Sequence, residues 1–342
     1  MGFTPERLTV ARERRGLSRA GLARVAEVAE RSIRNYEAGE DEPRDSSLRA
    51  LASALDIPAE FLSGPPLEGL GETAASFRAA SKLPVYRRRA ALAAGSFAMH
   101  LAAYVAERFE LPEIRTPDLA GYEPELAADA VRASWGLGSG PAPNLVRLLE
   151  SKGVLVFALA EDCRELDAFS FWRWGRPFVM LNTMKSGERG RLDAAHELAH
   201  LVLHRHVPEV TKEHEDEAQS FAGAFLLPRS SVLASGACGA GLRQVLEQKK
   251  VWRVAATAYT RRLHQLDLLS DWQYRSLMIE LTKRGYRSGE PDGMQRESSQ
   301  LMHMILSELR RDRIGINRLA DELQMSAGDV RSLMLGLVPV VV

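Results

Sequence analysis

A short string in the middle of the chain, Ala-Ala-His-Glu-Leu-Ala-His at 194–200, constrains the fold more than any other feature. His196 and His200 are four residues apart, so on a helix both imidazoles lie on one face, about one turn apart. Two neutral imidazoles can supply half of a tetrahedral zinc shell, and Glu197 is placed to act as a general base. The flanking residues are apolar, which predicts a buried helix whose polar face needs partners.

His206 is one candidate for a third metal ligand. It stands ten residues after His196, as in the extended motif HExxHxxGxxH. That motif turns the chain at a glycine, and this sequence has Leu203 there. Without the turn the helix would carry His206 away from the other ligands, which disfavours it.

The acidic residues at 213–217 are the better candidates. They open a run with helical periodicity that ends at Pro228. Glu217 precedes the apolar stripe of this run and lies four residues before Phe221, so it is favoured as the ligand. Glu213 and Glu215 lie nearer the helix start, where the helix dipole favours carboxylates in any case. The choice among the three glutamates stays open.

Three separated blocks of the chain resemble the ImmA/IrrE metallopeptidases, namely a strand at 177–182, a helix at 191–200 and a second helix at 215–228. The resemblance implies zinc on His196, His200 and Glu217, with Glu197 as the base. Gln219 departs from the Asn or Asp that the family has at its position.

The first 64 residues carry a second signal. Between Arg7 and Leu62 the pattern predicts five short helices, with Ser18 as an N-cap. The segment resembles the lambda-repressor-like (XRE) helix-turn-helix, and the resemblance implies a recognition helix at 30–36. The residues that would contact DNA are Arg19, Arg31, Ser32, Arg34 and Asn35.

Charge supports DNA binding in part. Residues 1–34 hold eight Arg and four Glu, a net charge of +4, whereas residues 35–64 hold two Arg and seven acidic residues, a net charge of −5. The basic leading half suits contact with phosphates, but the module as a whole is not basic. Binding to a protein or formation of a homodimer is the alternative role.

The organisation predicted for the chain is α+β, mostly α, in three domains. These are a helix-turn-helix domain at 1–64, a zinc-peptidase-like domain with a small sheet at 65–236, and a helical C-terminal domain at 237–342. Strands are expected at 153–159, 168–174 and 177–181, the last two as a hairpin. Residues 242–269 are expected to be helical and amphipathic. Residues 316–334 have helix-turn-helix spacing, which we interpret as an interaction helix pair rather than a second DNA reader.

The compartment expected is the cytoplasm. Two cysteines, Cys163 and Cys238, suit a reducing environment and are expected to be buried. The first residues are charged and lack an apolar core segment, so no signal peptide is expected in them. The longest apolar stretch, 90–106, is too short and too polar to span a bilayer, so it predicts a buried helix and no membrane partner.

Two functions fit these features. The first is a DNA-binding transcriptional regulator with a zinc-dependent endopeptidase domain that cleaves a repressor or regulatory protein in a stress or mobile-element response. Glu197 favours it, because a pure sensor needs no general base. The second is a non-proteolytic regulator that uses the peptidase fold to sense a ligand or a metal, and the fusion to a DNA-binding module favours this alternative.

Overall fold

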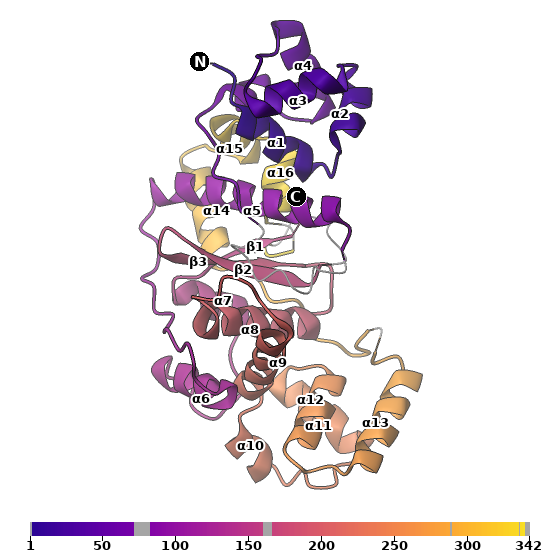
Figure 1. Cartoon of the computed structure of the whole chain (residues 1–342). Coiled ribbons are helices and arrows are strands. Elements are labelled where there is room, and N and C mark those ends of the chain that lie inside the picture. Colours follow the sequence, from indigo (N-terminus) through magenta and orange to yellow (C-terminus); the bar gives the residue numbers. More distant parts are fainter. Residues whose placement is uncertain (1, 72–82, 160–165, 288, 335, 339–342) are drawn as a thin grey trace. The chain divides into compact units, whose positions relative to one another are not determined.

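Helices dominate the computed structural model, which describes residues 2–71, 83–159, 166–287, 289–334 and 336–338 (Figure 1). The described chain divides into two compact units, the first drawn from residues 1–111, 157–166 and 300–338, and the second from residues 112–156 and 167–299. The division passes through strand β1 (Leu155–Ala158). The predicted class, α+β and mostly α, is confirmed.

The first unit is helical. Its elements are α1 (Pro5–Arg14), α2 (Arg19–Ala26), α3 (Glu30–Ala38), α4 (Asp45–Ala54), the 3-10 helix η1 (Ala59–Ser63), α5 (Val85–Ala106), α14 (Leu301–Arg311), α15 (Ile316–Leu323) and α16 (Ala327–Ser332). The five short helices expected between Arg7 and Leu62 are therefore present, the fifth as a 3-10 helix. The predicted N-cap also forms, because the Ser18 hydroxyl accepts the Gly21 N–H at 2.9 Å.

The helix-turn-helix pair is α2 and α3. Glu27 ends α2 in the left-handed conformation, at φ 54°, and so turns the chain toward α3. Ile33 and Tyr36 of α3 are buried in the core of the unit. Gly39, at φ 70°, ends α3 with the conformation that glycine adopts without strain.

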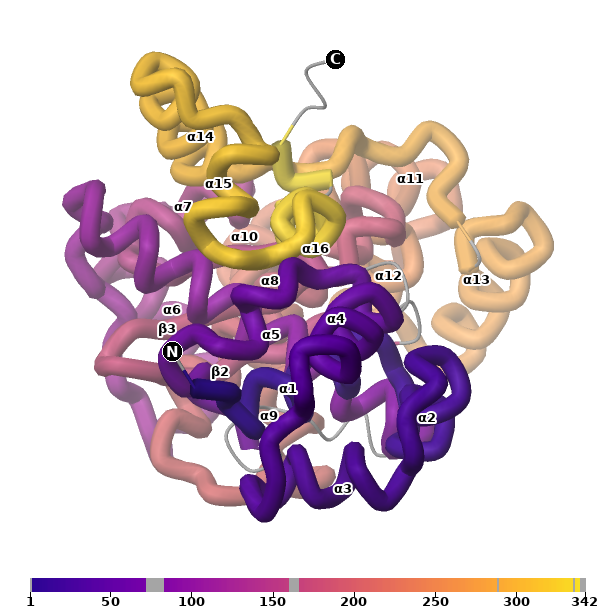
Figure 2. Tube along the Cα trace, turned by 90° about the horizontal axis from the view of Figure 1, so that it is seen from above, coloured from indigo at the N-terminus to yellow at the C-terminus, as the bar shows by residue number. Residues whose placement is uncertain are grey.

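Helix α5 contacts α1 and α15 within the same unit (Figures 1 and 2). Most of its side chains are buried, as the apolar stretch predicted. The three-domain expectation had assigned residues 237–342 to one C-terminal domain, whereas the compact unit groups α14 to α16 with the N-terminal helices.

A buried carboxylate joins α16 to the end of α1. Asp329 of α16 accepts two hydrogen bonds from the Arg15 guanidinium, both at 2.7 Å, and lies 3.5 Å from Nε of Arg14. Its side chain is only 3% exposed. Sequence periodicity shows α16 as a helix but cannot show a partner more than 300 residues away.

We expect Asp329→Ala to lower the free energy of unfolding of the full chain by about 3 kcal/mol, because two arginines lose their buried partner. Urea denaturation followed by circular dichroism measures this loss. Asp321→Ala, on the exposed face of α15, is the matched control and should change the stability by less than about 0.5 kcal/mol. Equal stabilities of the two variants would contradict the structural role of Asp329.

The second unit holds the sheet and the remaining helices. Besides part of β1 these are α6 (Pro124–Ser134), α7 (Leu145–Ser151), β2 (Ala168–Arg173), β3 (Arg176–Leu181), α8 (Gly187–Leu203), α9 (Lys212–Leu226), α10 (Arg229–Ala234), α11 (Leu242–Trp252), α12 (Ala256–Gln265) and α13 (Asp271–Lys283). The strand order is β1-β3-β2, so β2 is at an edge. Helix α8 packs on β2 and β3, and α9 packs on α8 (Figure 1).

The predicted hairpin is present. Strands β2 and β3 pair antiparallel, with Ala168 opposite Leu181 and Arg173 opposite Arg176. Trp174 and Gly175 make the turn, and both have positive φ, 49° and 70°, as a type I′ turn requires.

The helical stretch expected at 242–269 is broken into α11 and α12. Arg253 ends α11 in the left-handed conformation, at φ 56°. The break lets Glu290 accept the Ala256 N–H at the start of α12, at 3.1 Å, and the ammonium of buried Lys249, at 2.6 Å. The first N–H group of α12 has no capping side chain nearby in the sequence, and Glu290, from a distant segment, accepts its hydrogen bond instead.

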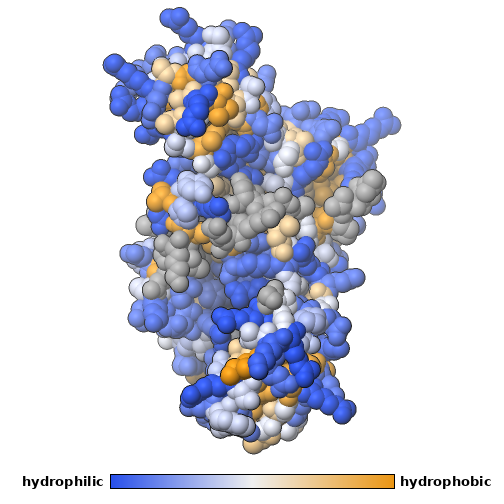
Figure 3. All heavy atoms as spheres, turned by 90° about the vertical axis from the view of Figure 1, so that its right-hand side faces the viewer, coloured by the Kyte–Doolittle hydropathy of each residue, from blue (hydrophilic) through white to orange (hydrophobic). Residues whose placement is uncertain are grey.

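One expectation about the cysteines is wrong: Cys238 is exposed rather than buried. Cys163 lies outside the described residues. Among the described helices, none is both long and apolar enough to cross a membrane. On the face drawn in Figure 3, hydrophobic side chains form small groups between hydrophilic ones.

Candidate metal centre

Helix α8 presents the His-Glu-x-x-His string. It begins at the N-cap Ser186, whose hydroxyl accepts the Arg189 N–H. The apolar residues within and around the string are fully buried, namely Ala194, Ala195, Leu198, Ala199, Leu201 and Val202. His196 and His200 share one face, with Nε2 atoms 3.2 Å apart. His200 is buried, whereas His196 keeps 19% of its side chain exposed and opens the group to solvent.

Glu215, from the first turn of α9, completes a group of three potential metal ligands. Its carboxylate lies 3.3 Å from Nε2 of His196 and 3.7 Å from Nε2 of His200. The three ligand atoms all lie within 4.8 Å of one another. Zinc–nitrogen bonds of about 2.0–2.1 Å place tetrahedral ligand atoms about 3.3 Å apart, so these separations fit a metal ion.

The structure brings Glu215, and not Glu217, to the histidine pair. Glu217 lies two residues further along α9, a rotation of about 200°, and its carboxylate is 2.8 Å from Nε2 of His204. Glu213 is exposed in the first turn of α9. His206 contacts Asp118 instead. The rotation of α9 about its axis determines which glutamate faces the histidine pair. That rotation depends on the residue at which the helix begins.

A chain of hydrogen bonds orients His200. Nδ1 of His200 lies 2.9 Å from Nδ1 of His204, and Nε2 of His204 lies 2.8 Å from Glu217. An ionised carboxylate only accepts, so Nε2 of a neutral His204 carries the proton and its Nδ1 accepts from His200. The Nε2 lone pair of His200 is therefore directed at His196 and Glu215. The i, i+4 spacing of His200 and His204 is the signal in the sequence that could have revealed this pair.

Burial and charge set the protonation of the histidines. Burial lowers the pKa of His200 well below its usual value and also lowers the pKa of His204, which keeps both imidazoles neutral near pH 7. Burial acts in the same direction on His196, but the hydrogen bond to Glu215 and the charges of Glu197 and Asp193 outweigh it and raise its pKa. The three carboxylates around His196 therefore favour positive charge at its imidazole, whereas burial keeps the other two imidazoles neutral.

Asp193 is a further residue that sequence reasoning missed. It precedes His196 by three residues on α8, and burial raises its pKa. Arg189 donates to one of its oxygens at 3.1 Å, while the other is buried with no hydrogen-bond partner among the described residues. Its charge adds to the negative field around His196.

Glu197 lies beside the ligand group, under the edge strand. Its side chain is buried, and its carboxylate accepts the Ser170 hydroxyl of β2 at 2.7 Å. Trp172, two residues along β2, donates its indole N–H to the carbonyl of Leu201 on α8. The edge strand is thereby fixed above the helix that carries the ligands.

The first unit places most of the predicted DNA-contacting residues on the outer side of α3. Arg31 and Arg34 are exposed, and Ser32 and Asn35 are half-buried. Neither arginine has an ion-pair partner among the residues that the structure describes. Arg19, at the start of α2, is instead engaged by Glu37 at 2.6 Å, and this hydrogen bond raises its pKa.

Comparison with protein-family models gives two matches. Residues 10–62 match a helix-turn-helix model, and residues 149–263 match the IrrE N-terminal-like domain of peptidase family M78. Neither the curated proteins nor the solved structures contain a significant match to the chain. The second matched segment contains the histidine pair, Glu197 and Glu215, and the first contains α3.

Proposed function

Because the chain joins an XRE-type helix-turn-helix domain to an ImmA/IrrE-like peptidase domain, we propose that it is a DNA-binding transcriptional regulator that carries a zinc-dependent endopeptidase. Its proposed substrate is a repressor or another regulatory protein, and its proposed compartment is the cytoplasm, where it would meet operator DNA.

The observation that carries the proposal is the group formed by His196, His200 and Glu215 with Glu197 beside it. The Nε2 lone pair of His200 and a carboxylate oxygen of Glu215 face each other at 3.7 Å, and two electron-rich atoms repel each other. A cation bound between them would turn this repulsion into attraction to both. Nitrogen and oxygen donors in a set of three suit catalytic zinc, which leaves a fourth position open. When bound, zinc supplies Lewis acidity toward a water molecule and a peptide carbonyl.

Glu197 is the proposed general base. It takes a proton from the attacking water and returns it to the leaving amine, as its place next to the ligand histidine allows. Strand β2, at one edge of the described sheet, is the proposed peptide-binding element, since an extended peptide can add to the edge of a sheet. The Ser170 hydrogen bond would hold Glu197 close to a peptide bound there.

The endopeptidase proposal is tested by digestion of a peptide library derived from a whole proteome. We expect the purified chain, loaded with zinc, to produce new peptide ends that mass spectrometry detects. A chelator should abolish these ends, and added zinc should restore them. Identical peptide ends with and without chelator would overturn the proposal and favour the non-proteolytic, sensing regulator.

DNA binding is proposed to depend on Arg31 and Arg34, whose guanidinium groups lie three residues apart on α3 and face solvent. We expect Arg34→Ala to weaken binding to DNA from upstream of the chain's own gene about tenfold, and the double variant with Arg31→Ala to weaken it further. Fluorescence anisotropy at several salt concentrations measures both affinity and its salt dependence.

Arg243→Ala, which removes an exposed arginine of α11, is the matched control and should leave the affinity unchanged. If the double variant bound DNA as tightly as the unmodified chain, α3 would not be the recognition helix.

A further inference from the structure

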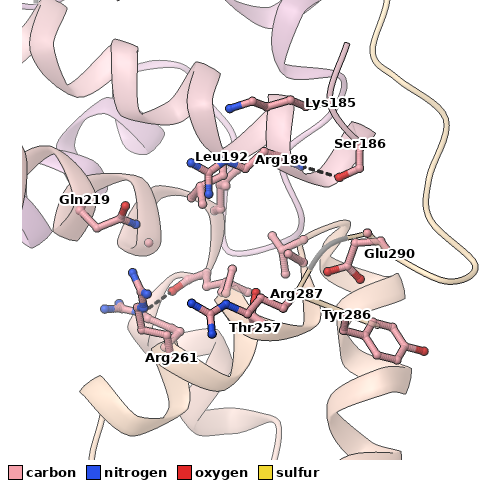
Figure 4. Close-up of a pocket in the computed structure, with 18 of the residues that line it drawn as sticks. Lys185, Ser186, Arg189, Leu192, Gln219, Thr257, Arg261, Tyr286, Arg287 and Glu290 are labelled. Atoms are coloured by element: carbon pink, nitrogen blue, oxygen red, sulfur yellow. Dashed lines mark hydrogen bonds between the residues drawn. The ribbon is translucent and has the colours of Figure 1, made fainter. Parts of the chain in front are cut away.

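A cationic pocket of about 580 Å³ lies in the second unit, between α8, α9, α12 and the segment after α13. Figure 4 shows Lys185 and Arg189 on one side, Arg261 and Arg287 on the other, and Gln219 at one end. Arg262 also lines the pocket, and Glu290 is its only acidic lining residue among those described. Five positive side chains thus surround one carboxylate.

Most of these charges are already paired. Lys185 and Arg189 both contact Asp167, and Arg262 contacts Glu125. The Glu290 carboxylate is held by Lys249 and the Ala256 N–H.

Two cations remain. Arg261 and Arg287 are exposed, and within the described parts of the chain neither has an ion-pair partner. The pocket therefore has an uncompensated positive charge at its mouth, which suits an anionic ligand.

The pocket lies next to the candidate metal centre, because both are built from α8 and α9. Leu192 lines it from α8, one turn before His196, and Gln219 lines it from α9, one turn after Glu215. Each of these two lining residues is therefore four residues along its helix from a member of the ligand group, His196 on α8 and Glu215 on α9, so the pocket adjoins that group. A chain segment that lies across the ligand group can therefore extend into the pocket.

We propose that this pocket binds acidic side chains of the peptide substrate, a few residues to one side of the cleaved bond. The occupant rests on the proposed peptidase function, whereas the preference for an anion rests on Arg261 and Arg287 alone. Guanidinium groups pair with carboxylates through charge-assisted hydrogen bonds, and the position beside the metal centre favours a peptide over a free anion.

Binding of labelled peptides to the full chain tests the proposal. The Glu197→Gln protein is used so that the peptides stay intact. The probes are two decapeptides of the same length, one with three glutamates and one with glutamines in their place. We expect the acidic peptide to bind about tenfold more tightly, and Arg261→Ala with Arg287→Ala to remove most of that difference. Arg243→Ala, outside the pocket, should keep it.

Two further results separate this proposal from the peptidase function. If the chain cleaves no peptide but still prefers the acidic decapeptide, the peptidase proposal fails and the anion site stands. If cleaved peptides have no acidic residue at a fixed distance from the cut and the two decapeptides bind equally, the site proposal fails and the peptidase stands. Displacement of the acidic peptide by micromolar inorganic phosphate, beyond the effect of matched sodium chloride, would identify a small-anion site and overturn the peptide assignment.

Discussion

Glu215→Ala is expected to strip zinc from the chain, from about one ion to less than about 0.1 per chain after dialysis. Its carboxylate is the only one within reach of both Nε2 atoms among the described residues, and two imidazoles alone leave the site half-empty. Elemental analysis of the dialysed protein measures the loss. His196→Ala and His200→Ala together should give the same result.

Glu217→Ala is the control that distinguishes a residue that binds the metal from one that only orients a metal-binding histidine. Glu217 orients His200 through His204, so its loss should weaken zinc affinity about 10- to 100-fold without emptying a saturated site. Glu217→Gln retains an acceptor oxygen and should restore most of the affinity. Loss of zinc from the Glu217→Ala protein with full retention in Glu215→Ala would show that the ligand is Glu217.

The second large effect is expected from Glu197→Gln. This substitution is nearly isosteric, so the protein should keep its fold and its zinc while peptide cleavage slows about 10²–10⁴-fold. The reason is that an amide cannot take the proton from water. Rates of cleavage on one identified peptide, measured with the zinc content of the same sample, give both quantities.

Glu209→Gln, an exposed glutamate after α8, is the matched control and should leave the rate unchanged. If fragments form equally fast with Glu197→Gln, Glu197 is not the base. If the variant also loses zinc, the group has been disturbed as a whole, and a general-base role for Glu197 is again not supported.

The sequence predicts the local parts of this fold and site. The i, i+4 spacing of His196 and His200, the apolar flanks and the turn at Trp174-Gly175 are all properties of short segments. The choice of Glu215 over Glu217 is different, because it depends on the rotation of α9 relative to α8. A helix start displaced by two residues would reverse it, and the acidic run alone does not mark the start.

Long-range partners are the features that periodicity cannot reveal. Lys185 and Arg287 line one pocket although about 100 residues separate them, and Glu290 serves a helix start 34 residues before it. Each of these side chains, taken alone, is typical of a solvated surface charge. Their roles follow from tertiary packing, which a single sequence does not specify residue by residue.

The pairing of Arg15 with Asp329 also affects when the first unit can finish folding during synthesis of the chain. Synthesis runs from the N-terminus, so Arg14 and Arg15 leave the ribosome more than 300 residues before the carboxylate that holds them. Closing so long a loop costs little more free energy than closing a shorter one, but contacts this distant in sequence form late. The first unit therefore reaches its final packing only after α16 has been translated. A chain that ends before α16 lacks the ion pair between Asp329 and the two arginines.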